Sequence, residues 1–131
     1  MGMGKGPIVR DILLIAADWQ ARALTLAELQ EAGYEVMALP GLRYGLKAVL
    51  LSRVAPRLVL LDVWHDDFAA PDRVRDLIRA LPGIPVVLIT GTFEREAYAA
   101  LEGQVSALLA RPVRVGDIVK RVKELLPPPG A

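Results

Sequence analysis

Four short stretches of the chain are apolar almost without interruption, and this constrains the fold more than any other feature. They are ILLIAA at 12–17, LVLL at 58–61, IPVVLI at 84–89 and VSALLA at 105–110, and a fifth, more mixed stretch is YEVMAL at 34–39. Short runs that are apolar on both faces are typical of strands in a parallel sheet that helices cover on each side. We therefore expect an α/β fold.

The segments between these runs have the periodicity of helices. One stripe is formed by Val74, Leu77, Ile78 and Leu81, and a longer one runs from Val115 through Ile118, Val119, Val122 and Leu125 to Leu126. Gly33 is placed as a C-terminal helix cap, and Pro56, the pair at 82–83 and the closing prolines are predicted to end the other helices. Strand and helix alternate five times, which predicts a doubly wound (βα)5 domain with right-handed crossovers.

Length, charge and cysteine content narrow the class of protein. A chain of 131 residues with a net charge of +1 predicts one folded domain without a phosphate-neutralising surface, so nucleic acid is not an expected partner. The chain has no cysteine, no signal-peptide pattern and no run long enough to span a membrane, which favours a cytoplasmic protein. We predict a flexible N-terminus at 1–7, the domain at 8–126 and a proline-rich tail at 127–131.

Polar residues stand where the predicted strands end. In an open parallel sheet, ligand sites lie beyond the carboxyl ends of the strands. The residues delivered to that edge are Ala16, Ala17 and Asp18 by the first strand, Asp62 by the third, Thr90 and Gly91 by the fourth, and Arg111 and Pro112 by the fifth. An aspartate, a threonine and an arginine are thus expected to converge on one edge.

On these residues the chain resembles the CheY-like receiver domains of two-component response regulators. The resemblance runs through ILLIAAD, LQEAGYEV, LVLLDV, IPVVLITG and LLARPV. It implies a flavodoxin-like sheet with strand order 2-1-3-4-5. It also implies that Asp62 occupies the phosphoacceptor position, that Thr90 and Arg111 occupy phosphoryl-contact positions, and that the bond before Pro112 is cis.

The chain departs from that family where the metal is held. The family carries two acidic residues at the end of its first strand as Mg²⁺ ligands, and here those positions are Ala16 and Ala17. Without them the phosphoryl charge is poorly neutralised, and no cofactor is expected unless Mg²⁺ binds a rebuilt site. Arginine replaces the family's lysine, and its planar fork favours a bidentate pair between Arg111 and Asp62.

Several residues near the predicted site have two interpretations. Asp18 and Asp66 are weak candidates for replacement metal ligands, although a helix N-cap is favoured for Asp18. Thr90 either keeps its phosphoryl contact or caps the following loop, and His65 is expected to be an exposed loop residue. Trp64 either contacts a partner or folds back over the pocket.

Two more residues are candidate interaction positions in the last third of the chain. Leu108 stands where the family has a switch aromatic, and Tyr98 is a candidate on the exposed surface between about Phe93 and Leu126. Helix packing is the alternative for Tyr98.

Three functions follow as hypotheses. The leading one is a non-enzymatic, atypical receiver domain for signal transduction, which binds a sensor kinase or downstream effector, or self-associates as a dimer, without normal Mg²⁺-dependent phosphorylation. The second is a working receiver phosphorylated at Asp62. The third is a flavodoxin-like small-molecule-binding domain, against which stands the lack of a glycine-rich phosphate loop after the first strand.

Overall fold

The computed structural model describes residues 6–130, so residues 1–5 of the predicted N-terminal segment and residue 131 of the predicted tail lie outside it. Five parallel strands form one sheet, as the sequence pattern predicts, and their order, β2-β1-β3-β4-β5, is the one that the receiver resemblance implies. The strands are β1 (Ile8–Ala16), β2 (Val36–Leu39), β3 (Val54–Asp62), β4 (Val86–Thr90) and β5 (Ala107–Ala110). The helices are α1 (Trp19–Glu31), α2 (Leu42–Leu50), α3 (Pro71–Ala80), η1 (Arg95–Gln104) and α4 (Val115–Leu125).

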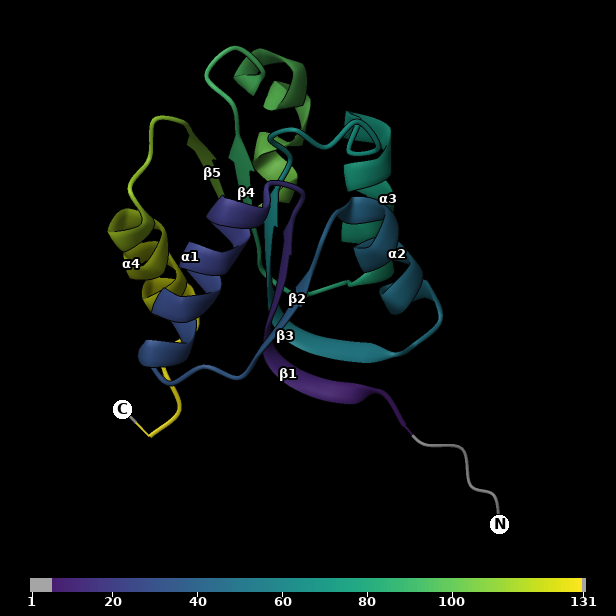
Figure 1. The fold of residues 1–131 in the computed structure, drawn as a ribbon. Coiled ribbons are helices and arrows are strands. Elements are labelled where there is room, and N and C mark those ends of the chain that lie inside the picture. The colour runs from purple at the N-terminus through teal and green to yellow at the C-terminus, as the bar shows by residue number, and fades with distance from the viewer. Residues whose placement is uncertain (1–5, 131) are drawn as a thin grey trace.

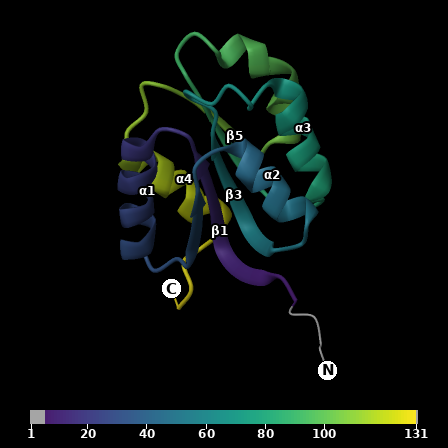
Figure 2. The ribbon, with the colours of Figure 1, turned by 45° about the vertical axis from the view of Figure 1, so that its right-hand side comes forward.

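Helices cover both faces of the sheet (Figures 1 and 2). On one face α1 and α4 bury Leu29 and Val122 against Leu58 and Leu60 of β3. On the other face α2, α3 and η1 pack against the alternate strand residues, among them Leu61 of β3. Because strand side chains alternate between faces, each apolar run contributes residues to the hydrophobic core on both faces of the sheet. This explains why the runs are apolar throughout.

The expectation that Pro56 ends a helix is wrong. Helix α2 already ends at Leu50, and Pro56 lies inside β3, opposite Arg10 of β1. Proline has no N–H to give to a sheet ladder, and it is tolerated here because the pairing of β3 with β4 begins only at Val59. Local sequence rules do not reveal which edge of a strand is unpaired.

The fourth helical element is a 3₁₀ helix, η1, rather than an α-helix. Its buried side chains are Tyr98 and Leu101, which are three residues apart and therefore on the same side of a helix with three residues per turn. The 5% exposure of Tyr98 corrects its prediction as a surface interaction residue. Its hydroxyl donates to the carbonyl oxygen of Ala69, at the loop before α3, so it is a core residue that ties η1 to that loop.

The buried tyrosine generates a prediction for stability. Burial, and then the charges of Glu94 and Asp66, raise the pKa of Tyr98 above its ordinary value of 10.0. A group whose pKa is raised by folding stabilises the fold fully below its unfolded pKa, and that stability is lost as pH rises through the folded pKa. Tyr98→Phe should therefore cost about 1 kcal/mol at neutral pH through the lost hydrogen bond, and less than that above pH 10.

Urea unfolding at neutral pH and above pH 10 measures both effects. Tyr44→Phe, at an exposed tyrosine of α2, is the matched control and should change stability by less than about 0.5 kcal/mol at either pH. An equal loss for Tyr98→Phe at both pH values would contradict the prediction.

Candidate functional site

The carboxyl ends of β3, β4 and β5 bring together Asp62, Thr90 and Arg111. Asp62 is the last residue of β3, with Ala16 of β1 and Ile89 of β4 opposite it. Thr90 ends β4, and Arg111 follows β5 and donates its backbone N–H to the carbonyl of Thr90 at 2.9 Å. The peptide bond from Arg111 to Pro112 is cis.

Arg111 and Asp62 form the two-point ion pair that the sequence predicts. Nη1 of Arg111 donates to Oδ1 of Asp62 at 2.7 Å, and Nη2 donates to Oδ2. The Asp62 side chain is 6% exposed and that of Arg111 19%. Both carboxylate oxygens are thus used by one guanidinium in a site with little access for water, the geometry in which charge-assisted hydrogen bonds are strongest.

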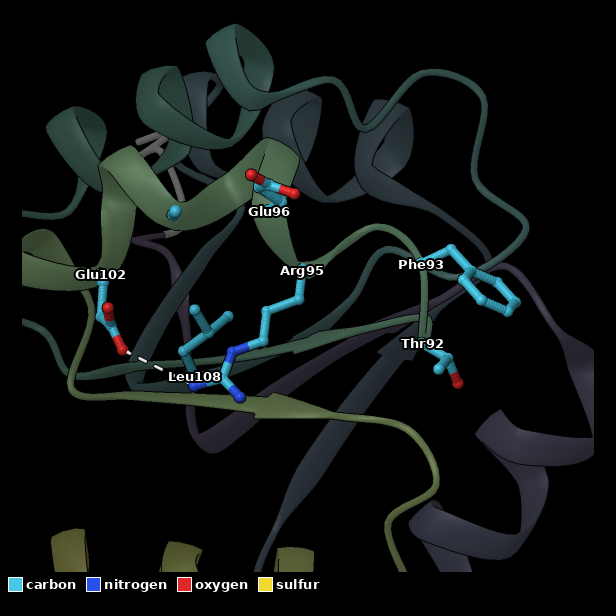
Figure 3. Close-up of a pocket in the computed structure, with 7 residues that line it drawn as sticks. Thr92, Phe93, Arg95, Glu96, Glu102 and Leu108 are labelled. Atoms are coloured by element: carbon cyan, nitrogen blue, oxygen red, sulfur yellow. Dashed lines mark ion pairs between the residues drawn. The ribbon is translucent and has the colours of Figure 1, made fainter.

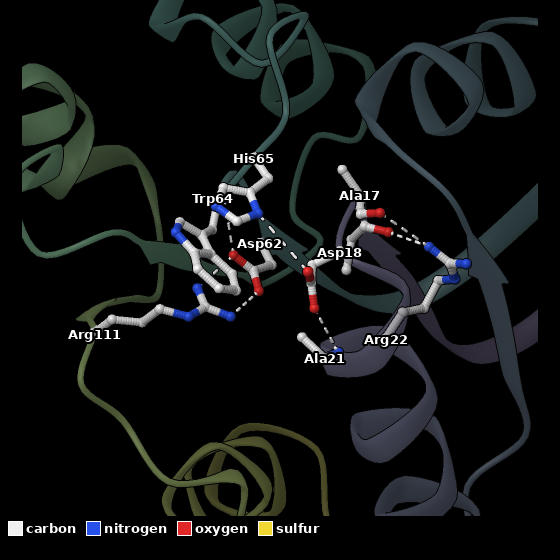
Figure 4. A network of polar contacts seen from close by, with 9 residues as sticks. Ala17, Asp18, Ala21, Arg22, Asp62, Trp64, His65 and Arg111 are labelled. Atoms are coloured by element: carbon white, nitrogen blue, oxygen red, sulfur yellow. Dashed lines mark hydrogen bonds and ion pairs between the residues drawn. The ribbon is translucent and has the colours of Figure 1, made fainter.

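Trp64 folds back over this pair, which decides between its two interpretations. Its backbone N–H donates to Oδ1 of Asp62 at 3.0 Å, and its ring lies 4.5 Å from the guanidinium carbon of Arg111 (Figure 4). His65 stacks on the other side of the indole at 3.8 Å between ring centroids. The tryptophan therefore shields the ion pair with a cation–π contact.

The end of β1 is organised by a second arginine. Arg22 of α1 donates from Nη1 to the carbonyl oxygens of Ala16 at 2.7 Å and Ala17 at 3.4 Å (Figure 4). Asp18 caps α1 by accepting the N–H of Ala21 at 2.9 Å, as expected. Its other oxygen lies 3.7 Å from Nδ1 of His65, whose side chain is 59% exposed.

Asp66 has a structural role that the sequence does not reveal. Its Oδ2 accepts the N–H of Leu42 at 2.8 Å, and its Oδ1 accepts that of Phe68 at 3.1 Å. Helix α2 begins at Leu42, and its N-cap residue, Gly41, has no side chain to cap it, so a carboxylate from the loop after β3 takes that place. A cap that arrives 24 residues later in the chain leaves no local sequence signal.

These contacts test whether the residues fit Mg²⁺. Both oxygens of Asp62 are held by Arg111, while Asp18 and Asp66 are held in helix caps. Within residues 6–130, no three histidine or acidic side chains are grouped as metal ligands. The donor set does not match a Mg²⁺ site, which needs several free oxygen ligands in octahedral geometry.

Two threonines lie beside the ion pair, in different environments. Thr90 is completely buried, and its Oγ1 has no hydrogen-bond partner in the described part of the chain. Thr92 instead ties the loops together, since its Oγ1 donates to the carbonyl of Arg111 at 2.9 Å. A buried hydroxyl without a partner is costly, so Thr90 is the polar group at this edge whose hydrogen bonding is not satisfied by the described residues.

Solved structures with a similar fold include receiver domains. A CheY-like response regulator receiver domain protein from Methanospirillum hungatei JF-1 has a TM-score of 0.77 and 22% identity, covering 92% of this chain and 94% of that one. The receiver domain of NtrX from Brucella abortus has a TM-score of 0.74 and 22% identity, covering 88% and 98%. The chain has the receiver fold.

The comparisons with known sequences support the assignment less than the solved structures do. No family model matches the chain. The response regulator protein VraR of Staphylococcus epidermidis is 30% identical over 70 residues, which are 53% of this chain and 34% of that protein. The chain thus spans about a third of the length of the curated relatives it matches. Among structures, an adenylate cyclase from Rhodopirellula baltica shares the receiver fold with a TM-score of 0.76 and 17% identity, covering 92% of this chain and 87% of that one.

The predicted interaction position Leu108 lies at the base of a surface hollow of this receiver fold. The hollow, of about 460 Å³, lies between β5 and η1 and has Phe93, Arg95, Glu102 and Leu108 in its wall. Figure 3 shows Arg95 reaching across it toward Glu102, and the two charged groups are 3.9 Å apart. Phe93 is 97% exposed at its rim, and Leu108 is half-buried. The sequence does not single out Phe93.

The geometry of the ion pair predicts the effect of breaking it. Arg111→Met leaves the Asp62 carboxylate buried without a partner and should lower the free energy of unfolding by about 3 kcal/mol. The double variant Asp62→Asn with Arg111→Met removes both charges and should recover part of that loss. Urea unfolding of the three chains measures the effects, and a double variant no more stable than Arg111→Met would contradict the prediction.

The cap that Asp66 provides to α2 predicts a smaller loss of stability. Asp66→Ala leaves the N–H of Leu42 at the start of α2 and that of Phe68 without their partner, and it should cost about 1 kcal/mol of unfolding free energy. Asp67→Ala, at the exposed neighbouring aspartate, is the matched control and should cost less than about 0.5 kcal/mol. Thermal denaturation of both variants compares them, and equal losses would show that Asp66 has no capping role.

Proposed function

We propose that the chain is an atypical, non-enzymatic receiver domain that acts in signal transduction through protein contacts, without normal Mg²⁺-dependent phosphorylation. The observation that carries this proposal is the buried two-point pair between Asp62 and Arg111. The receiver fold of its structural neighbours and the similarity to VraR, a response regulator, support a signalling role.

The pair opposes phosphorylation of Asp62 for a chemical reason. A phosphoryl group attaches to a carboxylate oxygen that must be free to attack, and its developing charge must be neutralised. Here the guanidinium holds both oxygens, and Trp64 stacks on that guanidinium. Freeing Asp62 requires breaking a buried ion pair, which costs several kcal/mol unless a new partner replaces Arg111.

The end of β1 supports the same proposal. Where the receiver resemblance places two carboxylates, Ala16 and Ala17 present only backbone carbonyls, and Arg22 already donates to both. A guanidinium is a fixed positive group that competes with a cation for the same oxygens. The positive charge at the end of β1 is therefore supplied by the Arg22 side chain, where the resemblance would place a metal ion.

The partners proposed for such a module are proteins. Response regulators work with sensor kinases and downstream effectors, so we expect this chain to contact one of these or a second copy of itself. The exposed Phe93 and the hollow above Leu108 offer an apolar surface for such a contact. With the Asp62 carboxylate held by Arg111, the contact would not depend on a phosphoryl signal.

One observation favours a second candidate, a phosphoacceptor receiver modified at Asp62. The Oγ1 of Thr90 is buried without a partner among the described residues, so a phosphoryl oxygen at Asp62 could give this hydroxyl the partner that it lacks. In this candidate a phosphoryl oxygen on Asp62 would accept a hydrogen bond from the Thr90 hydroxyl. Arg111 would turn from the carboxylate to the phosphoryl group.

Intact-mass measurement distinguishes the two candidates. After incubation with acetyl phosphate and Mg²⁺, the leading proposal predicts no added phosphoryl group, because Asp62 is held by Arg111 and no ligand set holds the metal. A phosphoryl gain that disappears in Asp62→Asn would overturn the proposal and establish the second candidate. A receiver domain that accepts phosphate from acetyl phosphate is the positive control.

Tryptophan fluorescence gives an independent readout. In a Trp19→Phe background, Trp64 is the single indole and lies against the ion pair, so a cation entering the site should change its emission. We expect no change on titration with Mg²⁺. The rebuilt variant Ala16→Asp, Ala17→Asp, Arg111→Lys should respond, because it restores carboxylate ligands and releases Asp62. A response of the parent chain equal to that of the rebuilt chain would count against the proposal.

A further inference from the structure

The edge of the sheet formed by β2 has a backbone that is free to pair. Within residues 6–130, β2 pairs only with β1. The N–H and the carbonyl of Glu35, just before β2, both bond toward β1. Because these groups alternate in direction along a strand, the N–H and carbonyl groups of Val36 and Ala38 point to the outer edge. The strand thus presents N–H and carbonyl groups with which an added strand could pair.

An apolar hollow of about 360 Å³ lies beside this edge, under α2. It is lined by Ile8 of β1, Met37 and Leu39 of β2, Tyr44 and Lys47 of α2, and Arg53. Met37 and Leu39 are only partly buried, although they point to the α2 face of the core, and Tyr44 is exposed. A side chain of an added strand would meet apolar surface here.

The rim of the hollow is positively charged. From 36 to 61 the chain has no acidic residue and four basic ones, Arg43, Lys47, Arg53 and Arg57. Lys47 and Arg53 are exposed, and the ion pairs among the described residues involve neither of them. The nearest carboxylates along β1 and β2 are already engaged, since Asp11 accepts the N–H of Glu35 and Glu35 lies 4.0 Å from Arg10.

These features indicate whether a second copy of the chain, a membrane or an extended peptide fits this surface best. A second copy would present the same basic edge, which has no acidic residue from 36 to 61, and so it brings no carboxylates to pair with Lys47 and Arg53. A membrane would leave the outward N–H and carbonyl groups without partners, because the lipid interior has none to offer. An extended peptide satisfies the backbone, fills the hollow and, when acidic, pairs with the two cations.

We propose that the β2 edge is a docking site for an extended acidic segment of a partner protein. The segment adds a strand to β2 through the backbone groups of Val36 and Ala38. An apolar side chain enters the hollow beside Met37 and Tyr44, and neighbouring carboxylates pair with Lys47 and Arg53. This site is separate from Asp62 and does not depend on the function proposed for it.

Selection from a display library of short random peptides on the immobilised chain tests the proposal. Enriched peptides should alternate acidic and apolar residues. Their affinity should fall by about tenfold or more for the double variant Lys47→Glu, Arg53→Glu. The matched control, Lys120→Glu with Lys123→Glu on α4, changes the net charge equally at exposed positions and should leave the affinity unchanged.

A backbone variant separates strand pairing from charge attraction alone. Ala38→Pro removes an outward N–H and leaves the ladder to β1 intact, so it should fold and lose binding of the enriched peptides. If Ala38→Pro unfolds, the charge variants alone decide. The proposal is overturned by peptides without acidic enrichment, or by equal binding to the parent and the Lys47→Glu, Arg53→Glu chain. Self-association that the same variant abolishes would also overturn it, as would binding of phosphatidylglycerol vesicles that Ala38→Pro retains.

Discussion

The ion pair between Asp62 and Arg111 is the contact on which the arrangement of the functional edge depends. It joins the end of β3 to the loop after β5, across the end of β4. Arg111 is further fixed by its backbone bond to Thr90 and by the indole of Trp64. Since separating the pair would leave a buried charge without a counterion, the loops that meet here are held together by electrostatics as well as by packing.

Two further carboxylates at this edge are also engaged, each as a helix cap. Asp18 caps α1, and Asp66 caps α2 from a distant loop. Arg22 meanwhile occupies the carbonyl oxygens of Ala16 and Ala17. The carboxylates that a cation site would require thus serve to begin helices, and guanidinium groups stand beside the oxygens that remain. Thr90 differs from all of them because its hydroxyl has no partner in the described chain.

Much of the fold follows from the sequence, because strand runs, helical stripes and turn residues are local signals. The pair of Asp62 with Arg111 was also predictable, since both follow strands whose ends meet at one edge. The cap from Asp66 was not, because it reaches across 24 residues. For Tyr98 the sequence left a surface role and helix packing open, and the docking of η1 on the loop at Ala69 decides for burial. The prediction for Pro56 was wrong because a proline is permitted inside a strand where one edge has no partner, and β4 pairs with β3 only from Val59 onward.

The loop between β3 and α3 physically connects the ion pair with the proposed docking surface. Trp64 in this loop contacts both members of the pair, and Asp66, two residues later, holds the first turn of α2. Helix α2 in turn supplies Tyr44 and Lys47 to the hollow at β2. Binding at one surface influences the other only if this loop has two arrangements that the ligands favour unequally. The stacking of Trp64 and the cap from Asp66 stabilise the same arrangement, so a segment that moved α2 would act first on the Asp66 cap and through it on the loop that covers Asp62.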